Sequence, residues 1–384
     1  MTYPFDGITT VQRKFLIGTS DWSNYVLKWP TIKPTINNFT GQKLTIDLSN
    51  VDKDFNDFYT YLYQIPQTCT LSFLEGTSEY TVFTGVVYDV KYKDTKCILS
   101  LRDRLGDFSR YKAILASGEP KTVDSLNPAL ITWQLGINYA GISDVAGSNN
   151  PDIDYDSYVA WAEVFSRDSI TMDAYYDGTT INKAWADIFE QTASQAFLTA
   201  QGKIKFRSKI DVSSSDYLLD DDYIKDLELN LKMDSVITKQ WVYGDYNPTS
   251  DGYGTNGYGI IVNHGDTANQ NSYGIFENIL KSENIWYTTS ANATYQAQKR
   301  IAIWKDPVKE WTLETGLNGI EIEIGQRIRF IDSFYGITSA DAWGITEKQI
   351  NMETGIIKFE LSSAVSLEPF ILDVSYLDGF QVLI

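Results

Sequence analysis

The chain has 384 residues, and its 50 acidic against 32 basic side chains give a formal charge of −18. At about 150 residues per domain, this length predicts two or three domains. The acidity argues against binding to nucleic acid or anionic lipid, since both depend on Lys and Arg. One histidine, His264, and two cysteines, Cys69 and Cys97, exclude a multi-histidine metal centre and a disulfide framework. We interpret the cysteines as buried thiols, with a single bridge between them as the alternative.

Targeting signals are not visible in the sequence. Residues 1–10 have neither the basic nor the apolar region of a signal peptide. No apolar run is long enough to cross a bilayer. We therefore expect a chain that is made in the cytoplasm and does not insert into a membrane.

The first 110 residues are predicted to be mainly β-structure. Apolar and polar residues alternate in the period of a half-buried strand, and a turn at 93–95 joins two such runs into a hairpin. Gly85 lies inside one strand, where glycine often marks a bulge or a bend. A short helix is predicted over 50–64 from its apolar spacing. We expect a small β-barrel over residues 1–110. Its predicted strands are 43–49, 69–74, 80–92 and 97–102.

The middle part, residues 111–225, is predicted to be a mixed α+β region. Apolar residues fall on one face of an amphipathic helix over 182–197. A turn around Gly202 then leads into a short alternating strand at 204–206. This order differs from the repeated strand–helix–strand rhythm of a nucleotide-binding sheet.

Residues 226–365 are predicted to form a second β-barrel that is interrupted by a loop-rich insertion over 244–290. Within it, 244–259 is rich in Gly, Tyr, Asn and Ser, which predicts an exposed loop or a protruding hairpin. A helix over 292–304 ends before Pro307. The apolar segment 366–384 is expected to dock on a neighbouring surface. The predicted strands are 227–231, 236–243, 311–317, 320–324, 327–330, 343–351 and 356–361.

An internal similarity links the two predicted barrels. A strand containing Gly85 leads through a short turn to a closing strand at 97–101, and a strand containing Gly344 leads in the same way to 356–361. Two explanations are open: a duplication, and chance, since β-rich chains also produce such hairpins without one.

The sequence contains no recognisable catalytic or cofactor motif. No glycine-rich phosphate loop or nucleophile elbow is present. His264 lies in a predicted turn, without an evident orienting partner for a general base. Pairs of carboxylates, as a glycosidase would use, are unavoidable in a chain with 50 acidic residues and therefore do not indicate catalysis. We therefore predict no catalytic, cofactor-binding or metal residue.

Two segments leave alternatives open. Asp152, Asp154, Asp156 and Glu163 have the spacing of a calcium loop, but Ser157 replaces its glycine, and a solvated acidic loop explains the pattern equally. The stretch Tyr243–Tyr258 has the composition of an adaptable binding loop, or of a plain flexible one.

The order of elements resembles the baseplate and tail-tip hub proteins of tailed bacteriophages. The resemblance lies in the spacing of the predicted elements and includes no diagnostic motif. The stretches that carry it are 83–87 with 97–102, 185–206, 272–274, 292–304 with Asp306-Pro307, 324–330, and 343–346 with 356–361.

This resemblance implies an α+β, mainly β fold with two small tube-type barrels and an inserted mixed region. It further implies a non-enzymatic, cofactor-free virion protein that forms a homotrimer. Such a hub joins the sixfold tail tube to a threefold tip, spike or fibre, with a distal tail protein as a further neighbour. DNA would pass through this ring without binding, because an acidic wall repels phosphate. The alternatives are a distal tail or receptor-binding tail protein, and a carboxylate glycosidase acting on cell-wall glycan.

Overall fold

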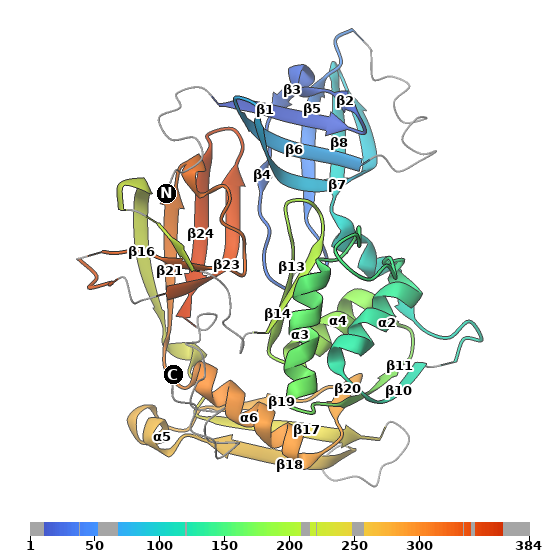
Figure 1. Cartoon of the computed structure of the whole chain (residues 1–384), viewed down its shortest axis with the longest axis vertical. Helices are drawn as coiled ribbons and strands as arrows, with labels where there is room; N and C mark the ends of the chain where they lie inside the picture. Colours follow the sequence, from blue (N-terminus) through green and yellow to red (C-terminus); the bar gives the residue numbers. More distant parts are fainter. Residues whose placement is uncertain are drawn as a thin grey trace.

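The computed structural model describes residues 11–37, 39–52, 68–119, 121–208, 216–219, 221–247, 257–332, 334–338 and 342–363. Two curled β-sheets occupy the top and the left of the molecule in Figure 1. A region with several helices lies to the right, and a small sheet covered by a long helix lies below. The chain is thus α+β and mainly β, as predicted.

The first sheet is built from the N-terminal part of the chain, in the order β2-β1-β6-β7-β8-β5-β3. Its strands alternate in burial, so that Leu44, Ile46 and Leu48 enter the core while Thr45 faces outward. The predicted hairpin is confirmed as β7 and β8. The helix predicted over 50–64 lies largely outside the described residues. The strands are β1 (Gln12–Ile17), β2 (Ser20–Asp21), β3 (Val26–Lys28), β5 (Lys43–Ser49), β6 (Thr68–Glu75), β7 (Ser78–Lys93) and β8 (Lys96–Arg102).

Gly85 allows β7 to pack closely against its neighbour. A Cβ at this position would lie 2.4 Å from the Arg102 carbonyl oxygen and 2.7 Å from the Phe83 ring. We therefore expect Gly85→Ala to lower the free energy of unfolding by about 1–3 kcal/mol, as overpacked cores do. Urea unfolding measures this change, with Gly106→Ala as the control because its Cβ would meet nothing closer than 3.4 Å. Equal losses in the two variants would contradict the steric argument.

The second sheet is formed by the C-terminal part, in the order β15-β22-β23-β24-β21-β16. The strand predicted over 320–324 is wrong, since this segment forms a turn. Its alternating isoleucines are nevertheless buried, because the turn folds over the end of the core. The strands are β15 (Asp216–Leu218), β16 (Ile224–Lys232), β21 (Val308–Thr315), β22 (Arg327–Arg329), β23 (Ala342–Asn351) and β24 (Ile356–Ser362).

The two sheets repeat one another in strand order. In chain order, β3, β5, β6, β7 and β8 correspond to β16, β21, β22, β23 and β24, and both sets lie in the same sequence across their sheets. Each first strand also follows a 3₁₀ turn that ends in tyrosine, at Tyr25 and at Tyr223. The duplication inferred from the sequence is therefore present in the topology.

The match extends to the register of the strands. The β7–β8 ladder shifts by one residue after Val87, which pairs with Leu101, and the β23–β24 ladder shifts after Ile345, which pairs with Leu361. This register equates Gly344 with Val86 rather than with Gly85.

A second register shift also occurs at corresponding positions of the two sheets. The β3–β5 pairing shifts after Val26, and the β16–β21 pairing shifts after Ile224. Two bulges at corresponding places are a specific structural likeness, because a bulge fixes the bend and twist of the sheet around it.

The middle region packs its helices against short strands. The helix predicted over 182–197 begins as expected, but it ends at Gln191 because Ala193 has a left-handed backbone (φ 48°). Residues 194–198 form a strand that is buried along most of its length, so apolar spacing alone could not distinguish it from helix. The elements are β9 (Lys112–Ala113), β10 (Lys121–Leu126), α2 (Pro128–Ala140), α3 (Tyr155–Arg167), β11 (Met172–Tyr176), β12 (Thr179–Thr180), α4 (Ile181–Gln191), β13 (Ser194–Leu198) and β14 (Ile204–Ser208).

The insertion between β16 and β21 is more regular than the predicted loop-rich 244–290. It contains a three-stranded sheet in the order β18-β17-β19, and the helix predicted over 292–304 is confirmed as α6. None of the helices in the described part is long and apolar enough to cross a membrane. The elements are β17 (Lys239–Tyr246), β18 (Tyr258–Gly265), α5 (Thr267–Tyr273), β19 (Glu277–Leu280), β20 (Ile285–Tyr287) and α6 (Ser290–Trp304).

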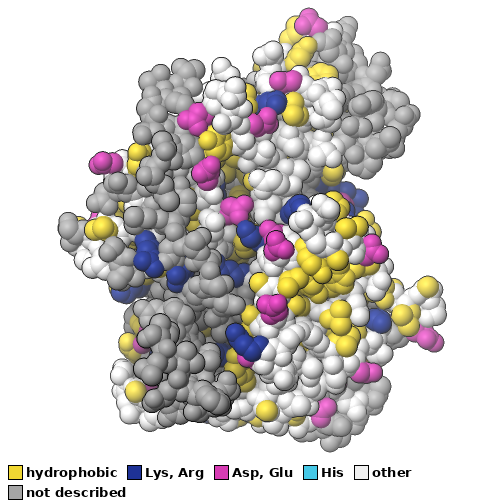
Figure 2. Space-filling view, in the orientation of Figure 1, with side chains coloured by type: hydrophobic (Ala, Val, Ile, Leu, Met, Phe, Trp, Pro, Cys, Tyr) yellow, Lys and Arg dark blue, Asp and Glu magenta, His cyan; other side chains and the backbone are white. Residues whose placement is uncertain are grey.

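Hydrophobic side chains gather on the face shown in Figure 2, over the helical region that contains α2 and α3. Three aromatic rings of α2 and α3 pack on one another: the Trp133 ring lies 4.8 Å from Tyr158 and 5.9 Å from Tyr155. All three residues belong to helices, so this aromatic surface is held by regular structure.

Candidate functional site: the junction between the two barrels

The two sheets are joined by a segment of the first half that crosses to the second. Residues Pro30–Ile36, which include β4 (Thr31–Ile32), run antiparallel to β23. Ile32 pairs with Ile350, and Thr35 pairs with Glu347. Three further backbone hydrogen bonds of 3.2 Å extend the contact: Ile36 N to Thr346 O, Lys348 N to Pro34 O, and Met352 N to Pro30 O.

The residue types of this segment suit the edge of a sheet. Pro30 and Pro34 have no N–H to donate, but their carbonyl groups accept from β23. Between them, Ile32 is 1% exposed and enters the core. At the surface, Lys33 Nζ lies 2.7 Å from Glu347 Oε1, and this hydrogen bond raises the pKa of Lys33.

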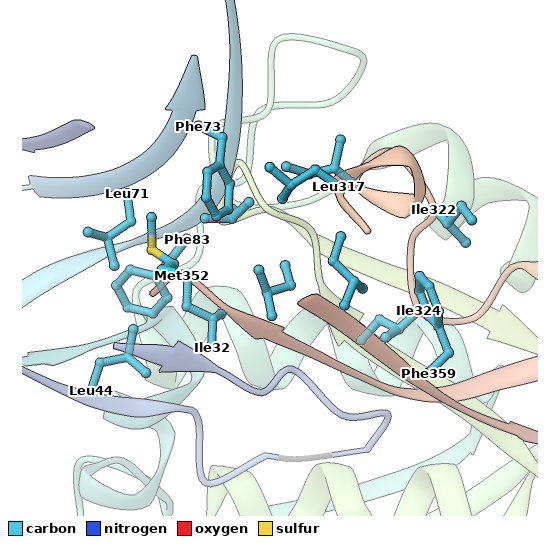
Figure 3. Packing of buried hydrophobic residues seen from close by; sticks show 14 of the residues in the cluster. Ile32, Leu44, Leu71, Phe73, Phe83, Leu317, Ile322, Ile324, Met352 and Phe359 are labelled. Carbon is cyan, nitrogen blue, oxygen red and sulfur yellow. The ribbon is translucent and has the colours of Figure 1, made fainter. Parts of the chain in front are cut away.

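The junction is continuous with a hydrophobic core that both sheets share. Figure 3 shows Leu71, Phe73 and Phe83 of the first sheet on one side of Ile32 and Met352. Leu317, Ile322, Ile324 and Phe359 lie on the other side. The two barrels therefore pack against each other through one hydrophobic core and are not independent domains joined by a linker.

Lys348 is a buried cation at the centre of the junction. Its Nζ donates to the carbonyl oxygens of Ile320 (2.6 Å) and Ile322 (2.8 Å), and the ammonium lies 5.8 Å from the centre of the Phe359 ring. Burial lowers the pKa of Lys348 to about 7. The side chain thereby fastens the turn that was predicted as a strand onto β23.

A cavity of about 340 Å³ lies beside Lys348, between the two sheets and the β13–β14 turn. The turn is held there by polar contacts, because the Thr84 hydroxyl donates to Ala200 O at 2.8 Å and Lys205 pairs with Glu323 at 3.2 Å. This arrangement fixes three parts of the chain relative to one another.

The four acidic residues with the spacing of a calcium loop, Asp152, Asp154, Asp156 and Glu163, do not lie in one loop. Asp154 is the N-cap of α3 and accepts from Ser157 N at 3.0 Å, so Asp156 and Glu163 lie on the helix itself. Asp152 instead accepts from Ser143 N at 2.8 Å. The calcium-loop interpretation is therefore wrong, because Asp156 and Glu163 lie along a helix that begins directly after Asp154. No cluster of three or more His, Cys, Asp or Glu suited to a metal occurs among the residues described.

The remaining sequence candidates are structural. His264 lies in β18 opposite Gln240, so its placement in a turn was wrong; the turn comes two residues later, where Asp266 caps α5. Cys69 and Cys97 are buried free thiols, as predicted. Burial raises the pKa of Cys69 to about 12 and that of Cys97 to about 11, so neither is a thiolate nucleophile at neutral pH.

The ends of the Tyr243–Tyr258 stretch form the two arms of a hairpin, while residues 248–256 lie outside the described part. The Tyr258 ring is buried between Tyr243 (5.4 Å) and Tyr246 (4.9 Å), and Tyr246 also contacts Trp286 (5.5 Å). These tyrosines stabilise the base of the hairpin by packing on one another. They are not a free contact surface.

Sequence reasoning missed the junction itself. Segment 30–36 is too short to show a strand period. Lys348 has the appearance of an ordinary polar residue in a strand, so its burial could not be predicted. The one available signal was the pair Pro30 and Pro34 around an isoleucine, which is typical of an edge strand.

Comparison with known proteins identifies the class of fold. Neither the protein-family models nor the curated sequences compared with the chain gave a match. Among solved structures, the chain is similar to the 43 kDa tail protein of prophage MuSo2 from Shewanella oneidensis, with 15% identity over 94% of this chain and 100% of that one (TM-score 0.56). It is also similar to the tail protein from Neisseria meningitidis MC58, with 14% identity over 92% and 96% (TM-score 0.58). The prophage tail protein gp18 from Listeria monocytogenes EGD-e matches with 11% identity over 95% and 97% (TM-score 0.53).

The chain therefore has the fold of phage tail proteins. Each of these matches covers nearly the whole of both chains, so the likeness includes the two barrels, the middle region and the insertion together. The resemblance inferred from the order of elements is confirmed at the level of the fold.

Proposed function

We propose that this protein is a structural component of a phage virion, the hub of a tail tip or baseplate. The observation that carries the proposal is the pair of barrels with the same strand order and the same two bulges. A chain with two equivalent barrels presents two equivalent surfaces to the next component. Three such chains supply six, which is the number a sixfold tube requires.

The hub is a homotrimer whose ring of six barrels joins the tail tube on one side to a threefold tip, spike or fibre protein on the other. Residues 1–110 and 226–365 supply the barrels. The middle region, residues 111–225, and the insertion between β16 and β21 lie outside the ring. Residues 366–384, which lie outside the described part of the chain, are proposed to dock on a neighbour, and a distal tail protein is a further proposed partner. The formal charge of −18 suits a channel that DNA passes without binding.

This role requires no catalysis, and the buried acid most altered by its surroundings has a structural explanation. Burial raises the pKa of Asp103 to about 6. Its carboxylate accepts from Gln42 N (2.6 Å) and Gly106 N (3.0 Å), so it closes the turn that leads into β5. The solved structures of similar fold are named as tail proteins, which also favours a non-enzyme over a glycosidase.

Mass measurement and imaging of the full chain test the proposal. We expect a species of three chains that appears in negative-stain images as a threefold ring with six similar lobes. Cell-wall glycan incubated with the same sample is expected to remain intact. A monomer that releases glycan fragments would overturn the hub in favour of the glycosidase.

A further inference from the structure

The junction within the chain has a counterpart on the first barrel that no strand of the described residues occupies. The matching registers equate β7 with β23, because Val90 pairs with Leu99 as Lys348 pairs with Phe359. The part of β23 that receives segment 30–36 thus corresponds to the end of β7. Along residues 88–91, no strand in the described part of the chain pairs with the edge of β7 that faces away from β8.

The second barrel has a matching edge to offer. β16 pairs with β21 along its whole length, and no described strand pairs with its other edge. Leu231 near its end is 53% exposed. β16 is also the counterpart of β3 and of the chain that continues from β3 into segment 30–36, since Val26 corresponds to Ile224 and Lys28 to Asp226.

We infer that β16 of one copy pairs antiparallel with β7 of the next copy and so repeats between copies the junction found within the chain. This inference rests on the proposed homotrimer and names the surface that forms it. The two edges differ, so the contact is head-to-tail, and such contacts close into rings when the rotation allows. Strand addition to an open edge satisfies the row of backbone groups that the edge presents.

The internal junction also sets the register between copies. Thr31 lies opposite Asn351 and Ile32 opposite Ile350. The aligned bulges equate Thr31 with Leu229 and Asn351 with Lys93. The same register between copies therefore places Leu229 opposite Lys93 and Leu231 opposite Lys91 of the neighbouring copy. Leu231 then lies against the aliphatic stem of Lys91, whose charged end stays in water, while Leu229 packs against the core of its own barrel.

Disulfide cross-linking of the full chain tests this register. In Lys91→Cys/Leu231→Cys, the two new thiols lie directly opposite across the copies, at the Cβ separation of about 4.5–5.5 Å typical of such pairs. Cys69 and Cys97 are buried, so they do not compete. Mild oxidation is expected to link up to three chains on a non-reducing gel. The matched control is Lys91→Cys/Glu228→Cys, whose second thiol is out of register and on the other face of β16; we expect no linkage from it, nor from either single variant of the test pair.

The outcomes separate this inference from the proposed function. A trimer by mass that fails to cross-link in the test pair would overturn the β16–β7 contact and leave the hub intact. Equal cross-linking in the control pair, or linkage that stops at two chains, would also overturn it. A full chain that stays monomeric and unlinked at high concentration would contradict both the contact and the trimeric ring.

Discussion

Replacing Trp161 by alanine is expected to lower the free energy of unfolding by about 3–5 kcal/mol, the range for large aromatic side chains removed from a core. Trp161 is 1% exposed and packs against both Phe189 (ring centres 4.9 Å apart) and Phe206 (5.2 Å), whose own ring centres lie 6.0 Å apart. Its Nε1 also donates to Ser194 Oγ at 2.8 Å. The substitution removes both ring contacts and leaves a polar atom of Ser194 with one partner fewer.

Urea unfolding followed by circular dichroism measures the loss. Trp133→Ala is the matched control, because Trp133 also lies on a helix of the middle region and contacts two tyrosines, but it is only partly buried. We expect the control to lose less than half as much stability. Similar losses in both variants would show that the stacked rings are not the centre of this core.

The stability of the protein is expected to rise between pH 7 and pH 10 through Lys348. Burial lowers the pKa of this side chain to about 7 in the folded state, against 10.5 for the ordinary group. Below pH 7 the lysine is charged in both states. Between the two values the unfolded chain still binds the proton while the folded chain has released it. Stability therefore increases with pH across this window, by up to a few kcal/mol.

The test compares the pH dependence of unfolding in the wild type and in Lys348→Met, which cannot titrate. The wild type is expected to gain stability relative to the variant as the pH rises from 7 to 10. Lys309→Met, at an exposed position of β21, controls for the loss of a lysine elsewhere in the same barrel. Parallel curves for wild type and Lys348→Met would contradict a buried lysine that releases its proton in this range.

Much of the fold could be predicted because local pattern and final environment agree. The β7–β8 hairpin alternates cleanly, and α6 has both a regular apolar face and a proline shortly after its end. The errors occur where every residue is buried. Residues 194–197 are buried whether they form helix or strand, so only the left-handed Ala193 decides the outcome. The isoleucines of 320–324 alternate because a turn buries them, not because a strand does.

The junction could not be predicted for a different reason. A strand of two residues, β4, has no period to detect, and its partner lies at the other end of the chain. The charge of Lys348 likewise gave no hint of burial, since its partners are the carbonyl groups of a distant turn. The calcium pattern was misleading because carboxylates at alternate positions also occur at the start of a helix, where Asp154 serves as a cap.

The crossing of segment 30–36 to β23 also determines when the protein can finish folding. Arg13 of the first strand donates to the carbonyl of Met352, 339 positions later, so the first barrel meets its partner only after Met352 has been synthesised. At the usual pace of synthesis, the segment waits on the order of tens of seconds with its edge open. Pro30 and Pro34 lack the N–H groups that a wrong partner would use, which protects the nascent chain from mispairing. These two prolines thus keep the junction available until β23 has been synthesised.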